Sequence, residues 1–354
     1  DIISYVVFSK ADYVFADQLE NLAKYFMNPK LADPNYDAGD LIDGYVENIG
    51  VAGGFKGYLP GPTGSLFGFP FGSETSVLAY RKDIFDQHGI PTPETYDQLL
   101  DAACKIPELE PGMGGMASRA ASGHQASHAF LLHLAPLGGR VFDDAWNPII
   151  NNAAGVEAAN ALKTIVDCGP EGAMSFGPSE AANAFATGQA AMFMDSIAFM
   201  PGFEDPERSQ VAGKVSYAMH PEGVRRGSQT GGFGIGIPKN AENKEAAFLL
   251  MQWLTSKKGD LMVAMEGGNP SRFSTYQDAG LNEKYPFAAT FGEALKFADP
   301  DLRPIIPVWG KINADSGTTM SKVLTEDLDI REALDGVAER TRAVMDDAGY
   351  YTWQ

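Results

Sequence analysis

The sequence predicts an α/β protein with two domains. Its 354 residues provide enough chain for two domains, each with a sizeable core. Hydrophobic residues make up 44% of the chain and charged residues 21%, an ordinary globular composition. Short apolar segments typical of strands alternate with segments whose apolar residues recur at helical spacing. The clearest case is the stretch from Gly227 to Ser274, where a glycine-rich strand precedes two helices.

The chain begins with a predicted strand over residues 2–8, followed by an amphipathic helix over residues 11–26. Residues 28–63 are rich in Pro, Gly, Asp and Asn, and we expect a loop with one short helix over residues 41–49. Two apolar strands follow, separated by the polar turn Ser73-Glu74-Thr75. Such turns often carry binding groups.

Thr95 is a predicted N-cap, and Gln98 three residues later completes the sequence pattern of a capping box. Residues 107–115 contain two prolines and three glycines, and we expect the first crossing between the domains there. The segment that follows is predicted to contain a strand starting at Met116, three helices and two more strands. The helices are expected over residues 125–137, 151–167 and 181–187, and the strands over residues 189–196 and 215–219.

Glycines at positions 232, 234 and 236 leave one face of a predicted strand without side chains. A ligand or another backbone can approach such a face closely. Pro238 ends the strand. We expect Asn240 or Asn243 to cap a helix that extends to Leu254, and a second helix over residues 258–265. A dinucleotide-binding loop is excluded, because the glycines run into Ile-Pro instead of opening a helix.

The net charge of −19 argues against nucleic acid and anionic membrane surfaces as partners. No apolar run approaches the roughly 18 residues of a membrane-spanning helix. The two cysteines, Cys104 and Cys168, leave open a disulfide or two separate buried thiols, and we favour the thiols.

Signals for catalysis are weak. His124 and His128 have the spacing to share a helix face and a metal ion, but no further ligand of matching spacing is evident, so we expect no metal. Neither a nucleophile elbow nor a phosphate-binding loop is present. A pair of carboxylates for glycoside hydrolysis is not excluded, because the distance between two carboxylates depends on the folded structure and cannot be read from the sequence. We expect no catalytic residues and no cofactor.

Several motifs, taken together, resemble those of a known protein family. They are the stretch from Gly68 to Phe85 with Tyr-Arg-Lys-Asp-Ile-Phe at its end, the segment from Gly89 to Leu100, the run Gln-Ala-Ala-Met at 189–192, and Gly-Gly-Asn-Pro-Ser-Arg at 267–272. In this order they resemble the extracellular solute-binding proteins of bacterial ABC importers, in the branch that carries sugars and polyols and includes maltose-binding-protein-like members. The resemblance covers nearly the whole chain.

The resemblance implies a periplasmic-binding-protein type II ("Venus flytrap") fold, with two discontinuous domains joined by a hinge and a ligand cleft between them. We expect one domain over residues 1–112 and 237–302, and the other over 113–236 and 303–354. The last crossing would be a proline-containing strand over residues 303–309, followed by helices over 311–324 and 331–346. In the family a strand–helix–strand unit precedes the strand predicted here over residues 2–8. We expect that this sequence lacks that unit, so the ligand contacts that it would supply are out of reach.

The function implied is capture of a sugar, sugar alcohol or sugar derivative for delivery to the membrane permease subunits of an ABC transporter. The protein would be a periplasmic monomer, or a membrane-anchored extracellular lipoprotein in a Gram-positive organism. Two alternatives remain: a carbohydrate-active enzyme that uses the same cleft, and a chemosensory sugar-binding protein. The ligand itself stays open among monosaccharides, sugar alcohols, sugar acids and short oligosaccharides.

A polyhydroxylated ligand needs paired donors and acceptors, together with apolar faces for its C–H surface. Arg272 is our first candidate, because its fork of donors can bind two neighbouring hydroxyls or a carboxylate. The alternative role for Arg272 is a salt bridge to a local carboxylate. The other candidates lie at strand ends, helix starts and the expected hinge: Ser73, Glu74, His124, His128, Asp195, Thr230, Gly231, Phe233 and Trp309.

Overall fold

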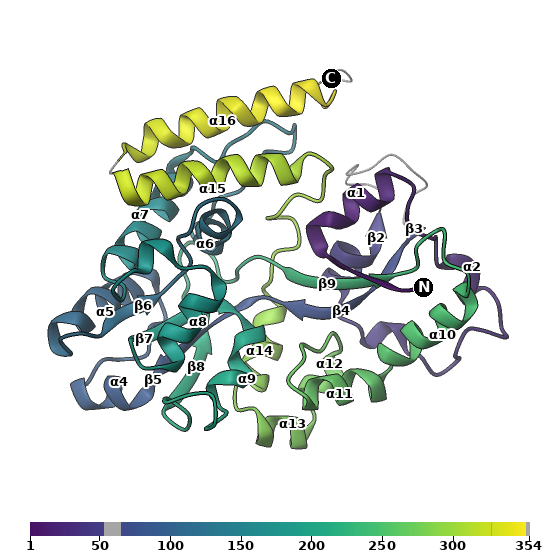
Figure 1. The fold of residues 1–354 in the computed structure, drawn as a ribbon, viewed down its shortest axis with the longest axis horizontal. Helices are drawn as coiled ribbons and strands as arrows, with labels where there is room; N and C mark the ends of the chain where they lie inside the picture. The colour runs from purple at the N-terminus through teal and green to yellow at the C-terminus, as the bar shows by residue number, and fades with distance from the viewer. Residues whose placement is uncertain (53–64, 327, 352–354) are drawn as a thin grey trace. The chain divides into compact units, whose positions relative to one another are not determined.

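The structure is a computed structural model that describes residues 1–52, 65–326 and 328–351 (Figure 1). The chain forms two compact units, each built from two separate segments. Unit 1 comprises Asp1–Thr75 and Thr230–Trp309, and unit 2 comprises Ser76–Gln229 and Gly310–Gln354. The chain therefore crosses between the units after residues 75, 229 and 309. The sequence analysis expected these crossings near residues 112, 236 and 302.

Strand pairing explains the different boundaries. Strand β5 (Ser76–Arg81) pairs with β7 (Ala190–Ser196) and β8 (Val215–Met219), so residues 76–112 belong to unit 2. The proline–glycine segment that we took for the first crossing partly continues helix α5 (Tyr96–Leu109), which contains Pro107. The predicted strand over residues 303–309 is wrong, because turns and irregular backbone lead there into the helix that begins at Trp309.

Unit 1 contains a three-stranded antiparallel sheet in the order β1 (Ile3–Val6), β9 (Gly231–Gly236), β4 (Gly68–Glu74). Strands β2 (Val51–Ala52) and β3 (Ser65–Leu66) form a separate pair. A π-helical turn, Val46–Gly50, precedes β2. The helices of this unit are α1 (Lys10–Phe15), α2 (Ala23–Phe26), α3 (Asp43–Tyr45), α10 (Lys244–Leu254), α11 (Lys257–Met265), α12 (Phe273–Tyr276), α13 (Ala279–Lys284) and α14 (Ala288–Leu295).

The side-chain-free face of β9 accommodates other parts of the protein. A Cβ atom on Gly232, whose φ is +107°, would lie 2.0 Å from the carbonyl oxygen of Gly72 in β4. A Cβ atom on Gly234 would lie 2.5 Å from the Ile49 side chain and 2.6 Å from the Tyr5 ring. The glycines are therefore required by close packing inside unit 1.

The predicted helix over residues 11–26 is two short helices, α1 and α2. Asp17, with a φ of 55°, turns the chain away after α1. The backbone N–H of Glu20 then donates to the carbonyl of Ile237 (2.8 Å), just beyond β9. The amphipathic pattern persists across the break because both helices pack on the same unit, so periodicity alone did not reveal it.

Unit 2 contains a four-stranded sheet in the order β6 (Gly114–Ala117), β7, β5, β8. Strands β6 and β7 are parallel, and the other two pairings are antiparallel. Figure 1 shows the last two helices of the chain running side by side. The helices of this unit are α4 (Lys82–His88), α5, α6 (His124–Leu134), α7 (Ala153–Asp167), α8 (Pro178–Ala186), α9 (Met200–Phe203), α16 (Ile330–Asp347) and α15 (Trp309–Glu326), which begins at the last residue of unit 1.

Each unit has its own aromatic core. In unit 1 the Phe248 ring stacks on Tyr25 at 5.1 Å between centroids. In unit 2 the Phe203 ring meets Phe185 at 4.7 Å and Phe193 at 5.2 Å. The predicted capping box at the start of α5 is confirmed, with Gln98 N donating to Thr95 Oγ1 at 3.4 Å.

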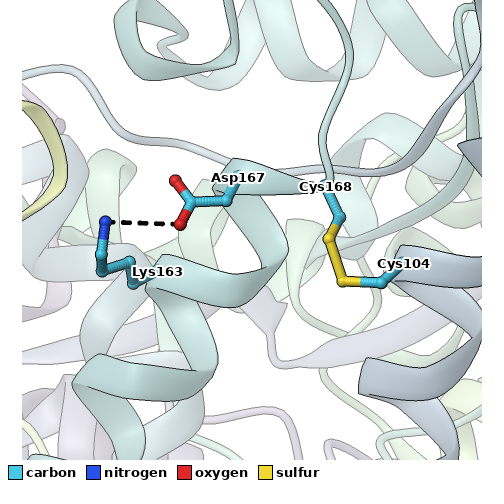
Figure 2. Close-up of a disulfide and its surroundings, with 4 residues drawn as sticks. All are labelled: Cys104, Lys163, Asp167 and Cys168. Carbon is cyan, nitrogen blue, oxygen red and sulfur yellow. Dashed lines mark ion pairs between the residues drawn. A yellow bond between two sulfur atoms is a disulfide. The ribbon is translucent and has the colours of Figure 1, made fainter.

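Cys104 and Cys168 form a disulfide that joins α5 to the end of α7 (Figure 2). Our preference for two separate thiols was therefore wrong. The two residues are 64 positions apart in sequence, and their Cα atoms lie 5.0 Å apart. Asp167, the residue before Cys168, forms an ion pair of 3.3 Å with Lys163 of the same helix. The sequence could not decide whether Cys104 and Cys168 are bonded, because α5 and α7 come close together only in the folded chain.

Candidate functional site

Polar side chains gather at the end of β4 in unit 1. Ser73 Oγ donates a hydrogen bond to Ser271 Oγ at 2.8 Å. Asn269 Nδ2 lies 3.5 Å from Glu74 Oε1, and the Tyr45 hydroxyl donates to the Glu74 carbonyl oxygen at 2.6 Å. We call Tyr45, Ser73, Glu74, Asn269 and Ser271 the β4 cluster. It combines hydroxyl, amide and carboxylate groups, which suits recognition of hydroxyl groups.

Asp260 in α11 holds the loop that supplies Asn269 and Ser271. Its Oδ1 accepts from Ser271 N at 2.9 Å, and its Oδ2 accepts from Thr275 Oγ1 at 2.6 Å. Burial raises the pKa of Asp260 to about 6, and these hydrogen bonds oppose the rise. Asp260 therefore positions the β4 cluster from behind.

Arg272 has a structural role in unit 1. Its Nε donates to the Thr255 carbonyl (2.7 Å), and its Nη2 donates to the Tyr36 carbonyl (2.8 Å). Its Nη1 contacts the Asp37 carbonyl at 2.8 Å and Asp40 Oδ2 at 3.2 Å. The side chain is fully buried and all three nitrogens have protein acceptors. We therefore withdraw Arg272 as a ligand contact: its alternative, an internal salt bridge, describes the structure.

The other candidates of unit 1 lie on or beside β9 and α15. Thr230 is buried, and its N–H and hydroxyl both point to the Asp299 carbonyl, at 3.1 and 3.4 Å. Gly231 pairs with Glu74 across the sheet. Phe233 is 41% exposed, which fits a ring available to a ligand better than a core position. Trp309 is buried, and among the described residues its indole Nε1 has no hydrogen-bond partner.

In unit 2, Asp195 near the end of β7 is the centre of a buried ionic group. Arg119 donates to both carboxylate oxygens of Asp195, through Nε and Nη2, at 2.5 Å each. His128 Nε2 lies 3.2 Å from Asp195 Oδ1, and the backbone N–H of Ser196 donates to the same oxygen at 2.6 Å. We call Arg119, His128 and Asp195 the β7 triad.

The electrostatics of the β7 triad keep Asp195 ionised. Burial alone would raise the pKa of Asp195, but the charges and hydrogen bonds of Arg119 and His128 outweigh it and hold the pKa well below its usual range. Both carboxylate oxygens of Asp195 therefore accept hydrogen bonds from groups within unit 2, among them His128. His128 Nδ1 in turn lies 3.4 Å from Gln229 Nε2.

His124 and His128 lie on one face of α6, with their ring centroids 5.9 Å apart. His124 Nδ1 is 2.8 Å from Asn313 Nδ2 of α15, a partner in the second segment of unit 2. Within residues 1–52, 65–326 and 328–351, no group of three or more His, Cys, Asp and Glu side chains is arranged to hold a metal ion.

The structure thus gathers two of the predicted residues in the β4 cluster, Ser73 and Glu74. It gathers three in unit 2, His124, His128 and Asp195. Sequence reasoning missed Tyr45, Arg119, Asn269, Ser271 and Asn313. Arg119 follows the end of β6 by two residues, so the rule that selected Asp195, a polar residue at the end of an apolar strand, would also have found it. Nothing in the sequence marks Asn313.

Comparisons with known proteins identify the family. A family model described as bacterial extracellular solute-binding protein matches residues 6–260, more than half of the chain. The chain belongs to this family. Its members are binding proteins, so the alternative of an enzyme falls away. Membership of an extracellular family places the protein in the periplasm or at the cell exterior.

Three relatives of this solute-binding protein illustrate the likeness. The mannitol-binding protein of Pseudomonas aeruginosa is 29% identical over 352 residues, which cover 93% of this chain and 78% of that protein. A solute-binding protein of Agrobacterium vitis S4 with bound D-mannitol has a TM-score of 0.84 at 26% identity, covering 99% of this chain and 86% of the other. One from Agrobacterium radiobacter K84 in complex with ribitol has a TM-score of 0.85 at 25% identity, covering 97% and 84%.

These structures share the type II periplasmic binding fold that the sequence resemblance implied, so that prediction is confirmed. Helices that could cross a membrane were sought in the described part of the chain, and none is long and apolar enough.

Proposed function

We propose that the protein captures a linear sugar alcohol and delivers it to the permease of an ABC importer. The observation that carries the proposal is that the mannitol-binding relative and two structural neighbours, one holding D-mannitol and one ribitol, all concern open-chain polyols. The two polar groups described above suit such a ligand, because each combines donors and acceptors that match hydroxyl groups.

In unit 1 we propose that Glu74 makes the principal contact, supported by Ser73, whose hydroxyl donates to Ser271, with Thr230 and Gly231 beside them. The Glu74 carboxylate accepts hydrogen bonds from ligand hydroxyls, and Asn269 holds it in place from the other side. The exposed Phe233 ring offers an apolar surface for C–H groups. Trp309 offers the indole N–H that the described protein leaves unpaired.

In unit 2 we propose that His124 and His128 bind hydroxyl groups. Asp195 and Arg119 fix the orientation of His128 through buried charge-assisted hydrogen bonds, so the imidazole needs little reorganisation when ligand arrives. Ligand contacts that favour one conformation of the protein over others shift the population towards it. We propose that the permease recognises this ligand-bound conformation.

The test is a thermal-shift screen of the purified protein against D-mannitol, ribitol, other alditols, monosaccharides and sugar acids. A ligand that binds only the folded state at a hundredfold excess over its Kd adds about 2.7 kcal/mol to the free energy of unfolding. We expect a rise of several degrees in Tm with one or more alditols, confirmed by isothermal titration calorimetry. Ser73→Ala and Glu74→Gln should weaken binding.

A protein that responds to none of the alditols or sugars would contradict the proposal. Transport is tested separately. We expect proteoliposomes that contain the permease, together with its ATPase, to take up labelled alditol only when the wild-type binding protein is present. Equal uptake without the binding protein would contradict a role in delivery.

A further inference from the structure

Asn313 in α15 has one buried polar atom that the protein itself does not satisfy. The residue is 6% exposed, and within the described ranges its Oδ1 has no hydrogen-bond donor. Leaving a buried acceptor unsatisfied is unfavourable. A ligand that brings a donor to this atom recovers that free energy, so the atom marks a place where a hydroxyl group is favoured.

His124 pairs with the nitrogen of this amide. Asn313 Nδ2 lies 2.8 Å from His124 Nδ1, and an amide nitrogen can only donate. His124 Nδ1 is therefore the unprotonated acceptor, and the neutral imidazole carries its proton on Nε2. In this orientation Oδ1 lies on the side away from Nδ1. The rotated amide would require the Nδ1–H tautomer, so the tautomer of His124 reports the orientation of the amide.

The surroundings disfavour an anionic group at this place. His124 shares its helix face with His128, which contacts the ionised Asp195. Arg119 donates to Asp195 through Nε and Nη2, and its Nη1 donates to Gln125 at 3.0 Å. A ligand carboxylate at this place would therefore face the acceptor oxygen of Asn313. The Arg119 guanidinium would not compensate, because its donors already bind Asp195 and Gln125.

We propose that Asn313 Oδ1 accepts a hydrogen bond from a hydroxyl group of the bound ligand and selects neutral polyols over the corresponding sugar acids. This rests on the proposed function and narrows it, because sugar acids were among the ligands that the sequence left open. Asn313 is thereby a specificity-determining residue, paired with His124.

The test compares wild-type protein with Asn313→Ala by isothermal titration calorimetry, using D-mannitol, ribitol and D-mannarate, in which both terminal carbons of the mannitol chain are carboxylates. Thr318→Ala is the matched control, because Thr318 is exposed on the same helix and its hydroxyl donates to the local Ala314 carbonyl (2.9 Å). Circular dichroism and Tm establish that each variant is folded.

We expect the wild type to bind the better alditol at least 100-fold more tightly than D-mannarate. Asn313→Ala should weaken alditol binding about 10-fold or more, since each 1.4 kcal/mol corresponds to tenfold, and should weaken D-mannarate less. Thr318→Ala should match the wild type. Alditol affinity in Asn313→Ala within twofold of wild type would overturn the inference, as would wild-type D-mannarate binding equal to that of the alditols.

A second measurement separates this inference from the proposed function. In ligand-free protein, 15N NMR of the His124 ring should show the Nε2–H tautomer, and Asn313→Ala should shift it towards a mixture. An Nδ1–H tautomer in the wild type would overturn the geometry whatever the ligand. Absence of binding by any neutral carbohydrate would overturn both the proposed function and the selectivity.

Discussion

Arg119 and Asp195 form a two-pronged ion pair inside unit 2. Both contacts measure 2.5 Å, and both side chains are buried. Paired in this way, two opposite charges are tolerated in an apolar interior, whereas one charge alone is not. The pair also fixes His128, so it connects the stability of unit 2 to the candidate site.

Replacing Arg119 by Met should lower the free energy of unfolding by about 3–5 kcal/mol, because Asp195 is left as an unpaired buried charge. Urea denaturation at pH 7 measures the change. Arg140→Met is the matched control, since Arg140 and Asp144 form an exposed pair at 3.1 Å, and such pairs contribute at most about 1 kcal/mol. Equal losses in the two variants would contradict the account of the buried pair.

A buried hydrogen-bond chain makes unit 2 sensitive to acid. Ser76 Oγ contacts His220 Nδ1 at 2.7 Å, and the Tyr96 hydroxyl lies 3.0 Å from both His220 Nε2 and His133 Nδ1. Burial lowers the pKa of His133 to about 4. Burial, with the nearby His133, lowers the pKa of His220 to about 3. Both imidazoles are therefore neutral in the folded protein at pH 7.

Between pH 6.5 and about 4 the unfolded chain binds more protons at these histidines than the folded chain does, so the free energy of unfolding should fall as the pH falls. Each histidine contributes a slope of up to about 1.4 kcal/mol per pH unit. Asp260, with a raised pKa of about 6, contributes a slope of opposite sign below pH 6. His133→Gln should make the decline shallower in urea titrations from pH 7 to pH 4.5. If the free energy of unfolding fell equally with pH in wild type and His133→Gln, His133 would not be a cause of the acid sensitivity.

Arg272→Lys should destabilise the protein by several kcal/mol, because an ammonium group cannot replace a guanidinium that donates to three carbonyls and Asp40. At a temperature where the variant remains folded, its Kd for an alditol should stay within about threefold of wild type. This distinguishes a structural arginine from a ligand contact. A large loss of affinity in a fully folded variant would restore Arg272 to the site.

Gly234→Ala should destabilise the protein by about 1–3 kcal/mol, because its Cβ atom would overlap with Tyr5 and Ile49. Gly44→Ala is the matched control, since a Cβ atom there meets nothing within 4 Å and Gly44 lies in α3. That substitution should be neutral or slightly stabilising. Thermal unfolding followed by circular dichroism compares the two. An unchanged Tm in Gly234→Ala would contradict the close packing of Tyr5 and Ile49 against this strand.

Removing the disulfide with Cys104→Ser and Cys168→Ser should lower the free energy of unfolding by about 2–4 kcal/mol, because the bridge closes a long loop between α5 and α7. The loss should appear in denaturation curves of the double variant and, for wild type, on adding reductant. Alditol affinity should be unchanged, since neither cysteine belongs to the clusters described. A wild-type curve that does not respond to full reduction would contradict a stabilising role.

The amino-acid sequence by itself determined the α/β character, most element positions, the start of α5 at Thr95 and the family. These depend on local signals: apolar periodicity, capping residues and short motifs in a fixed order. It also placed Ser73, Glu74, His124, His128 and Asp195 at strand ends or helix starts, which is where the structure has them.

Only the tertiary structure decided which residues meet. Arg272 looked like a ligand contact in its motif, but Tyr36 and Asp40, more than 230 positions away, occupy its donors. Asn313 carries no local signal. The packing of α15 against α6 leaves its oxygen buried and, among the residues that the structure describes, without a hydrogen-bond donor. The Cys104–Cys168 bridge and the crossings at residues 75, 229 and 309 are similar cases. Strand pairing and side-chain contacts join distant segments, and local sequence patterns do not encode their distances.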